Sequence, residues 1–254
     1  MKNNFVIGIQ CFVKLEILQL VLEKLEQCYG ANKYTLVLFV DSSDNLLYNR
    51  PDWIEKNKNL INYIKNYTSD KFKKIIKYYE KNNVGPYVGC KKTVDLCFQY
   101  SDYIIFMEDD SFVSKDYFLY YEYLFDHFML FDDNIFAGSA VTTICKNQGI
   151  TNEIEKVCWI NPTEFSITKK IWYKFGHLRG KICGDVEFGF AVKRNNKYTL
   201  MCKNYHRMEK LGIGHPDSFS VLQNAESIKK QPKNIILPID TKEIDINNYS
   251  LKLV

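Results

Sequence analysis

Residues 102–110 read DYIIFMEDD, an apolar run that ends in three consecutive carboxylates, Glu108, Asp109 and Asp110. The run is typical of a strand that is buried on both faces. Adjacent carboxylates repel one another, and burying one of them without a partner is costly. Hard divalent ions such as Mg²⁺ and Mn²⁺ remove that cost, because they take oxygen ligands, often from one or two protein carboxylates. We therefore expect a buried strand with a cation site at its end; a solvated acidic loop is the alternative.

Two more candidate strands precede this stretch, over 4–13 and 34–45, and both are rich in β-branched and aromatic residues. Leucines at helical spacing over 14–28 lie between them. Alternating strands and helices predict an α/β fold with a mixed, mostly parallel sheet flanked by helices. Such sheets bind ligands at the carboxyl ends of their strands. Asp41, where the second strand ends, and the acidic triplet are thus expected to face one crevice.

The rest of the chain predicts further elements. Before the acidic strand we expect a polar, lysine-rich stretch to about residue 66, a short apolar piece over 72–79, a turn over 80–89 and a helix over 90–101. After it we expect an aromatic helix over 114–131 that begins at a Ser114 cap, and strands over 134–141, near 156–176 and over 198–207. A helix is expected over 184–196, a loop over 208–218, and a tail over 231–254 that lies over the domain or makes contacts. The economical prediction is one domain, 1–254.

Composition excludes several classes of protein. The chain has 254 residues, of which 46% are hydrophobic, as in ordinary globular proteins. Its net charge of +4 comes from 34 basic and 30 acidic residues that are scattered along the chain. This pattern predicts no nucleic-acid partner, whereas a small polyanionic ligand or an anionic membrane surface suits it. The eight cysteines stand singly and no apolar run is long enough for a signal peptide or a membrane span, so we expect a cytoplasmic protein.

The segment DYIIFMEDDSFVSKDYFLYYEYLF resembles the metal-binding segment of GT-A nucleotide-sugar glycosyltransferases. It is most similar to the N-acetylglucosaminyltransferase I type, in which E-D-D follows a buried strand and precedes an aromatic helix. The resemblance is specific over about 100–128, looser over 5–45 and patchy beyond 150. It implies a GT-A (Rossmann-like) fold with a nucleotide-binding half over about 1–112, an acceptor and catalytic half over about 113–230, and a tail over 231–254.

The resemblance also implies roles at the acidic strand end. Asp110 would bind Mn²⁺ or Mg²⁺, Asp109 would approach the ribose or the water shell of the metal, and Glu108 would face the donor sugar. Asp41 would reach the nucleobase or ribose, and Gln10 on the first strand would lie under the base. A turn-forming role is the alternative for Asp41.

The segment NNVGPYVGCKK, residues 82–92, resembles the family's loop and helix start beside the diphosphate. Gly85 and Gly89 would permit close approach of the backbone, and amides at a helix N-terminus favour phosphate. Lys91 or Lys92 would add charge. A simple turn is the alternative, because glycine, proline and asparagine are common in turns.

The segment KICGDVEFGFAVKRN resembles the helix start that carries the general base of inverting GT-A enzymes. Asp185 would be the base and Glu187 a supporting residue. Gly184 stands where many relatives carry an acid, and a two-residue shift would make Glu187 the base. A helix cap is the other alternative for Asp185.

Two further residues are expected near the donor. His215 is the candidate third metal ligand, because some GT-A enzymes use a histidine from a glycine-rich C-terminal loop; His206 is the second choice. Trp159 would line a sugar site, since sugar rings stack on aromatic side chains.

The resulting hypothesis is a metal-dependent, inverting hexosyl- or N-acetylhexosaminyltransferase. It would move a sugar from a nucleoside-diphosphate sugar, expected to be a UDP-sugar, to a glycan or glycoconjugate in polysaccharide biosynthesis. A lipid-linked acceptor would bring it to the inner face of the membrane as a peripheral protein. The alternatives are a sugar-phosphate nucleotidyltransferase, although the N-terminus lacks the glycine-rich basic loop of that class, and a noncatalytic glycan-binding relative.

Overall fold

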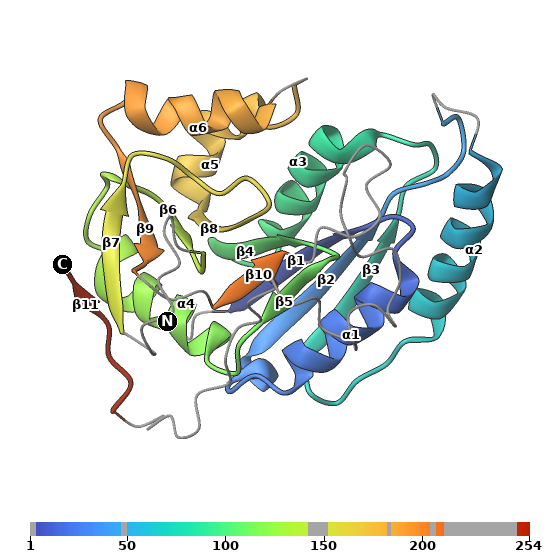
Figure 1. Cartoon of the computed structure of the whole chain (residues 1–254), viewed down its shortest axis with the longest axis horizontal. Helices are drawn as coiled ribbons and strands as arrows, with labels where there is room; N and C mark the ends of the chain where they lie inside the picture. The colour runs from blue at the N-terminus through green and yellow to red at the C-terminus, as the bar shows by residue number, and fades with distance from the viewer. Residues whose placement is uncertain (1–3, 47–49, 142–151, 182–183, 204–206, 211–247) are drawn as a thin grey trace, which may run out of the picture.

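The computed structural model describes residues 4–46, 50–141, 152–181, 184–203, 207–210 and 248–254 (Figure 1). Its centre is a nine-stranded sheet in the order β11-β7-β9-β6-β8-β4-β1-β2-β3, beside a two-stranded sheet, β10-β5. The strands are β1 (Phe5–Cys11), β2 (Tyr34–Val40), β3 (Lys74–Tyr79), β4 (Tyr103–Glu108), β5 (Ser111–Val113), β6 (Ile135–Ser139), β7 (Glu153–Val157), β8 (Glu164–Thr168), β9 (Tyr198–Cys202), β10 (Met208–Lys210) and β11 (Lys252–Leu253).

Most neighbours in the large sheet are parallel. Strands β3, β2, β1 and β4 pair in parallel, as do β6 with β9 and β7 with β11. Strand β8 runs antiparallel between β4 and β6, and β7 runs antiparallel to β9. The predicted mixed, mostly parallel α/β sheet is confirmed.

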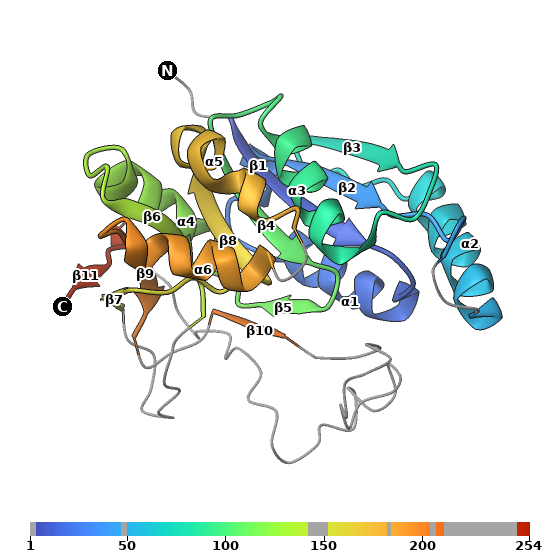
Figure 2. The ribbon, with the colours of Figure 1, turned by 90° about the horizontal axis from the view of Figure 1, so that it is seen from above.

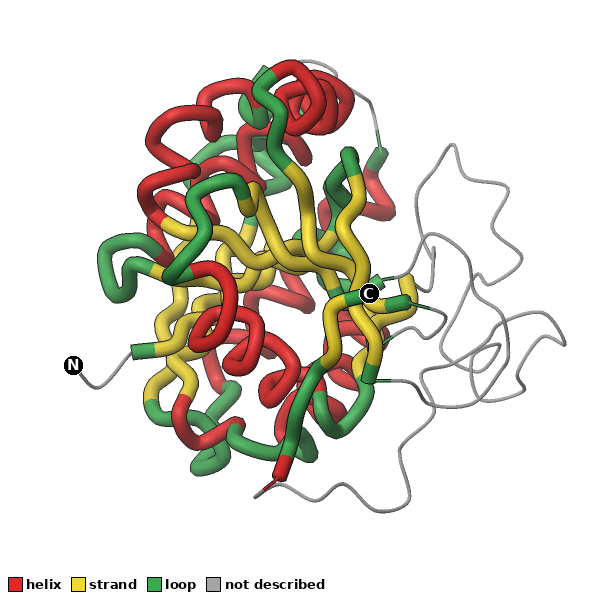
Figure 3. Tube along the Cα trace, turned by 90° about the vertical axis from the view of Figure 1, so that its left-hand side faces the viewer, coloured by secondary structure: helices red, strands yellow, loops and turns green. Residues whose placement is uncertain are grey.

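Helices cover both faces of the sheet (Figures 2 and 3). Alternate residues of β1 belong to different cores: Ile7 and Ile9 to one, Val6 to the other. On the first face lie α1 (Leu15–Glu26), α2 (Pro51–Asn66) and α4 (Tyr117–Leu124), which a π-helical turn, Phe125–Met129, continues. On the second face lie α3 (Gly85–Cys97), α5 (Lys169–Phe175) and α6 (Gly184–Arg194).

In the first half, one helix was not predicted and two sequence expectations were wrong in detail. The polar stretch before residue 66 is the helix α2, which buries only Asn57, Leu60 and Ile64 and therefore shows little apolar pattern. Helix α3 begins at Gly85, so the expected turn supplies its first residues. Ser114 does not cap α4: the residue before this helix is Asp116, and the Ser114 hydroxyl donates to the Asp116 carboxylate instead.

The single strand expected near 156–176 is divided into β7, β8 and α5. Of the expected tail, residues 231–247 lie outside the described residues, and residues 252–253 pair with β7 as an edge strand.

A buried ion pair at the start of α4 also binds the residue Tyr249, shortly before β11. Arg207 Nε donates to Asp116 Oδ2 over 2.7 Å, and both side chains are fully buried. The Tyr249 hydroxyl donates to the same oxygen over 3.0 Å, and Leu251 is buried in the first core. In the part of the chain that is described, no helix is long and apolar enough to cross a membrane.

Candidate donor and metal site

The acidic residues after β4 lie beside the loop that follows β1. Strands β1 and β4 are parallel, with Gln10 opposite Glu108. The loop after β1 therefore passes the end of β4, and the amide of Phe12 donates to Asp109 Oδ2 over 3.2 Å. The side chains of Asp109 and Asp110 are buried, at 5% and 1% exposure. The predicted buried carboxylates at a parallel strand end are thus present.

Lys14 is the cation that these carboxylates share. Its Nζ lies 2.9 Å from Asp110 Oδ2 and 3.5 Å from Asp109 Oδ1. Burial lowers the pKa of the ammonium, but the two carboxylates outweigh that effect and hold this pKa above its usual range. Lys14 is therefore charged at every physiological pH, and it stands where a bound cation would stand.

One lysine does not fully compensate the pair. Burial, together with repulsion from Asp110, raises the pKa of the Asp109 carboxyl in spite of the attraction by Lys14. Asp110 Oδ1 is buried without a hydrogen-bond partner among the described residues. An unsatisfied buried carboxylate oxygen is costly, and oxygen is the ligand that Mg²⁺ and Mn²⁺ prefer. Asp109 and Asp110 thus fit a divalent ion, although no third His, Cys, Asp or Glu joins them among the described residues.

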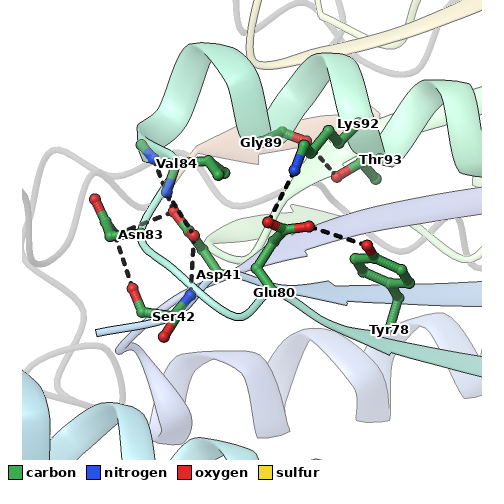
Figure 4. Close-up of polar contacts among 10 residues, drawn as sticks. Asp41, Ser42, Tyr78, Glu80, Asn83, Val84, Gly89, Lys92 and Thr93 are labelled. Carbon is green, nitrogen blue, oxygen red and sulfur yellow. Dashed lines mark hydrogen bonds and ion pairs between the residues drawn. The ribbon is translucent and has the colours of Figure 1, made fainter. Parts of the chain in front are cut away.

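Asp41, at the end of β2, is held by the start of α3 (Figure 4). Its Oδ1 accepts from the amides of Ser42 and Val84 over 2.9 and 3.0 Å. Its Oδ2 accepts from the amide of Gly85 over 3.0 Å and from Asn83 Nδ2 over 3.2 Å. Burial raises the pKa of Asp41, while these amide bonds act in the opposite direction. The carboxylate therefore anchors the loop before α3, in line with the turn-forming alternative.

Helix α3 packs closely on β1, and this packing places Gln10. A Cβ on Gly8 would lie 2.5 Å from Cys97 Sγ, and a Cβ on Gly89 would lie 2.3 Å from Gln10 Nε2. Both glycines are thus required for close approach. Gln10 and Glu108, paired across β1 and β4, lie on the side of the sheet that α3 covers, because alternate residues of both strands face the second core.

The predicted base lies on α6, beside the exposed aromatic pair Trp159 and Phe190. Asp185 is the second residue of α6, not the residue before it, and it makes no hydrogen bond or ion pair with another described residue. One turn further, a Cβ on Gly189 would lie 2.5 Å from the Trp159 ring, so the indole rests on the helix backbone. Trp159 also contacts Phe190 edge to face, with ring centroids 5.9 Å apart. Glu187 pairs with Arg194 over 3.3 Å on the surface.

The remaining predicted residues are placed as follows. Lys91 Nζ bonds Asp95 on the same helix over 2.5 Å, so its ammonium has a partner within α3 and is not shared with the acidic pair. His206 and His215 lie outside the described residues. The short strand β10 pairs with β5, with Lys210 opposite Ser111, the residue directly after Asp110.

Sequence reasoning missed Lys14 and Asn57. Asn57, on α2, is buried; its Nδ2 donates to the carbonyls of Phe12 and Asp41 over 2.7 and 2.9 Å, and so joins the loops after β1 and β2. The local sequence does not show what either residue contacts, because the partners of Lys14 are more than 90 positions away and those of Asn57 more than 10. A lysine directly after the first predicted strand was the one available hint.

Solved structures with this fold include PcManGT and TarS. The mannosyltransferase PcManGT of Pyrobaculum calidifontis, in complex with GDP-Man and Mn²⁺, has a TM-score of 0.51 at 8% identity, over 80% of this chain and 56% of its own. S. aureus TarS 1-349, in complex with UDP, has a TM-score of 0.51 at 11% identity, over 81% of this chain and 59% of its own.

The chain thus spans less than two thirds of either structure. At these identities the likeness establishes the fold alone. No protein-family model matches the chain, and no curated protein is detectably similar to it in sequence. The narrower resemblance to the N-acetylglucosaminyltransferase I type remains a prediction.

Proposed function

We propose that the chain is a metal-dependent glycosyltransferase that uses a nucleoside-diphosphate sugar. The observation that carries this proposal is the buried pair Asp109 and Asp110 at the carboxyl end of β4, with one oxygen unpartnered. Open α/β sheets bind their ligands at this edge. The two structures with the same fold were solved with GDP-Man and Mn²⁺ and with UDP, which supports a donor of this class.

The donor would lie across the ends of β1 and β4. Asp110 and Asp109 would hold Mn²⁺ or Mg²⁺, with His215 as a third ligand. When bound, the ion stabilises the negative charge that grows on the departing diphosphate. Gln10 and Glu108, adjacent across the two strands, would contact the nucleotide and the donor sugar. Asp41 keeps a proposed contact with the base or ribose, but its four hydrogen bonds make an anchoring role the better supported one.

The acceptor would bind along α6. Residues four apart lie on the same face of a helix, so Asp185 and Gly189 share a face and Trp159 rests one turn from Asp185. A sugar stacked on the indole would present a hydroxyl near a carboxylate that has no described partner. Glu187 is engaged by Arg194, which favours Asp185 as the general base and Glu187 as a supporting residue. Lys91 would need to leave Asp95 to reach a phosphate.

The finer proposal is an inverting transferase for a UDP-sugar, hexosyl or N-acetylhexosaminyl, with a glycan or glycoconjugate acceptor in polysaccharide biosynthesis. A base opposite the leaving group implies inversion at the anomeric carbon. The proposal includes a cytoplasmic enzyme that contacts the inner face of a membrane when its acceptor is lipid-linked. It also includes the division into a nucleotide-binding half, about 1–112, and an acceptor half, about 113–230.

A thermal-shift screen tests the function. UDP-, GDP-, CMP- and dTDP-sugars are added with and without Mn²⁺, because a ligand that binds the folded state raises its stability. We expect one nucleotide class to raise the melting temperature only with Mn²⁺, and that donor to be hydrolysed slowly. No stabilisation by any donor contradicts the proposal. Turnover of a sugar phosphate with a nucleoside triphosphate would identify a nucleotidyltransferase instead, and Mn²⁺-dependent binding without hydrolysis a noncatalytic relative.

Substitution of Asp185 tests the base. Asp185→Asn should keep donor and Mn²⁺ binding but lose about 100- to 10,000-fold in transfer rate, the contribution that positioned proton transfer typically makes. Glu187→Gln is the matched control and should lose far less, because its partner is Arg194. Product with retained configuration, seen by NMR, would exclude a base role for either residue.

A further inference from the structure

We propose that Lys14 is a built-in cation that neutralises Asp109 and Asp110 when no donor is bound and that competes with the divalent ion for them. The inference rests on the proposed function, since it concerns the same carboxylates. It adds a residue that controls how tightly the site takes a metal. The proposed ligand is a hard divalent cation, and Mn²⁺ is the probe.

The geometry places the ammonium where the ion would be attracted. Lys14 Nζ lies 2.9 Å from Asp110 Oδ2 and 3.5 Å from Asp109 Oδ1, so it bridges the two residues. Both carboxylates are buried, and the Lys14 side chain is 17% exposed. A divalent ion on the same oxygens would lie within a few ångströms of the ammonium. At such separations and in such burial, two cations repel strongly.

The lysine can leave without disturbing the fold. The main chain of Lys14 is fixed, because its carbonyl accepts from the Leu18 amide over 2.9 Å at the start of α1. The ammonium, in contrast, is at the end of a flexible four-carbon stem. Displacement therefore needs new side-chain torsions only, and the partly exposed side chain has solvent to move into.

The pair is also unlike an ordinary structural salt bridge. A buried ion pair stabilises the folded state only when its remaining lone pairs are satisfied. Asp110 Oδ1, however, has no partner among the described residues. Two carboxylates against one ammonium also leave a net negative charge. The two carboxylates can therefore bind a divalent cation in place of the ammonium. We expect this ion to bind weakly alone and more tightly when donor phosphates supply further ligands.

The test measures the affinity of the full chain for Mn²⁺ without nucleotide. Electron paramagnetic resonance gives the concentration of free Mn²⁺ during the titration. We expect Lys14→Met to bind Mn²⁺ about 10- to 100-fold tighter than the wild type, since the competing charge is gone. Lys14→Arg keeps the charge and should bind as weakly as the wild type. Lys33→Met is the matched control, because Lys33 forms an ion pair with Glu122 over 2.7 Å and not with the acidic pair. Equal or weaker binding by Lys14→Met overturns the inference.

A second measurement on the wild type keeps the inference testable if Lys14→Met does not fold. Acetylation of lysines, followed residue by residue by mass spectrometry, should be slow at Lys14 without Mn²⁺ and several-fold faster with saturating Mn²⁺, while Lys33 stays constant. An unchanged rate at Lys14 overturns the inference. Neither experiment uses a nucleotide sugar. A failure of the donor screen would therefore leave these outcomes intact, and failure here would leave a donor-binding function standing.

Discussion

The carboxylates at the ends of β2 and β4 look alike in sequence but have opposite surroundings. Asp41 accepts from three backbone amides and Asn83, so both of its oxygens are engaged. Asp109 and Asp110 together have one backbone amide and one lysine, and one oxygen has no described partner. An acidic residue at a strand end therefore indicates only where a ligand site can lie. The hydrogen bonds around each carboxylate then distinguish one that holds a loop, such as Asp41, from one that is left to bind a ligand.

The largest effect is expected at the end of β4, where Asp110 has an oxygen without a described hydrogen-bond partner. Asp110→Ala should lower the Mn²⁺-dependent affinity for the recognised nucleotide by at least about 100-fold, because a charge-assisted ligand to the ion is lost. Isothermal titration calorimetry with the nucleotide, with and without Mn²⁺, measures this affinity. The circular dichroism spectrum should remain that of the wild type. Undiminished affinity would show that the β4 end is not the metal site and would remove the contrast with Asp41.

A second large effect is expected at the end of β2, where both oxygens of Asp41 have hydrogen-bond partners. Asp41→Asn should lower the free energy of unfolding by about 3 kcal/mol, because the new amide group faces the donors at Gly85 and Asn83 and leaves them unpaired. Urea denaturation measures the loss. Nucleotide affinity at low temperature, where the variant is folded, should change little. A large loss of affinity with wild-type stability would instead support the predicted contact of Asp41 with the nucleotide.

Glu164 offers a third kind of buried carboxylate, satisfied by side chains instead of a helix start. Its carboxyl group is hydrogen-bonded to the hydroxyls of Tyr117, Tyr121 and Ser139, one of which can take the proton of the neutral acid, and it accepts from the amide of Ala140. Burial raises its pKa to about 8. The folded state therefore keeps a proton that the unfolded chain releases near pH 4.5, so this group makes the protein less stable as pH rises from about 4.5 to about 8.

Glu164→Gln should abolish that part of the pH dependence. We expect the wild type, relative to Glu164→Gln, to lose about 3 to 4 kcal/mol between pH 5 and pH 8. Urea unfolding at several pH values gives the difference, in which the contributions of all other titrating groups cancel. Parallel pH profiles for the two proteins would show that Glu164 is ionised in the folded state.

The smallest effect is expected on removal of one side chain that donates a hydrogen bond to Asp41. Asn83 Nδ2 donates to Asp41 Oδ2 over 3.2 Å and to the Ser42 carbonyl over 2.8 Å. Asn83→Ala should lower the free energy of unfolding by about 1 kcal/mol, since the three backbone amides still hold the carboxylate. Nucleotide binding should not change. A loss as large as that of Asp41→Asn would mean that the side chain of Asn83, and not the backbone, holds the anchor.

The parts of the fold that sequence predicted are those with strong local patterns. Strands β1, β2 and β4 are continuous apolar runs because both faces of each are covered, and α1 has a clear apolar stripe. Helix α2 was missed because it lies on the protein surface and buries few residues. The antiparallel position of β8 between β4 and β6 was also missed, because strand order depends on contacts between segments far apart in sequence.

In the candidate site, too, local sequence patterns predicted some residues, whereas contacts between distant segments were not predicted. The acidic residues at the end of β4 were predicted because they interrupt an apolar pattern, and Asp185 was predicted from a family resemblance; their roles stay predictions. Lys14 was not found, since a lysine at the start of a helix is ordinary until the fold brings Asp110 to it across 96 positions. Likewise, only the structure shows that Glu187 is engaged by Arg194 and Lys91 by Asp95.

The short strand β11 also has a consequence for solubility. By pairing with β7 it covers part of an outer edge of the nine-stranded sheet, and Leu251 and Tyr249 hold it there. The opposite edge, β3, is interrupted by Lys74 and Lys77, which discourage the addition of another strand. The sequence of β7, EIEKV, carries its own charges, but its Ile154, the ladder partner of Leu253, is buried in the first core. A chain shortened before residue 249 would expose that edge and should form aggregates by strand-to-strand association, even with every residue of the proposed donor site intact.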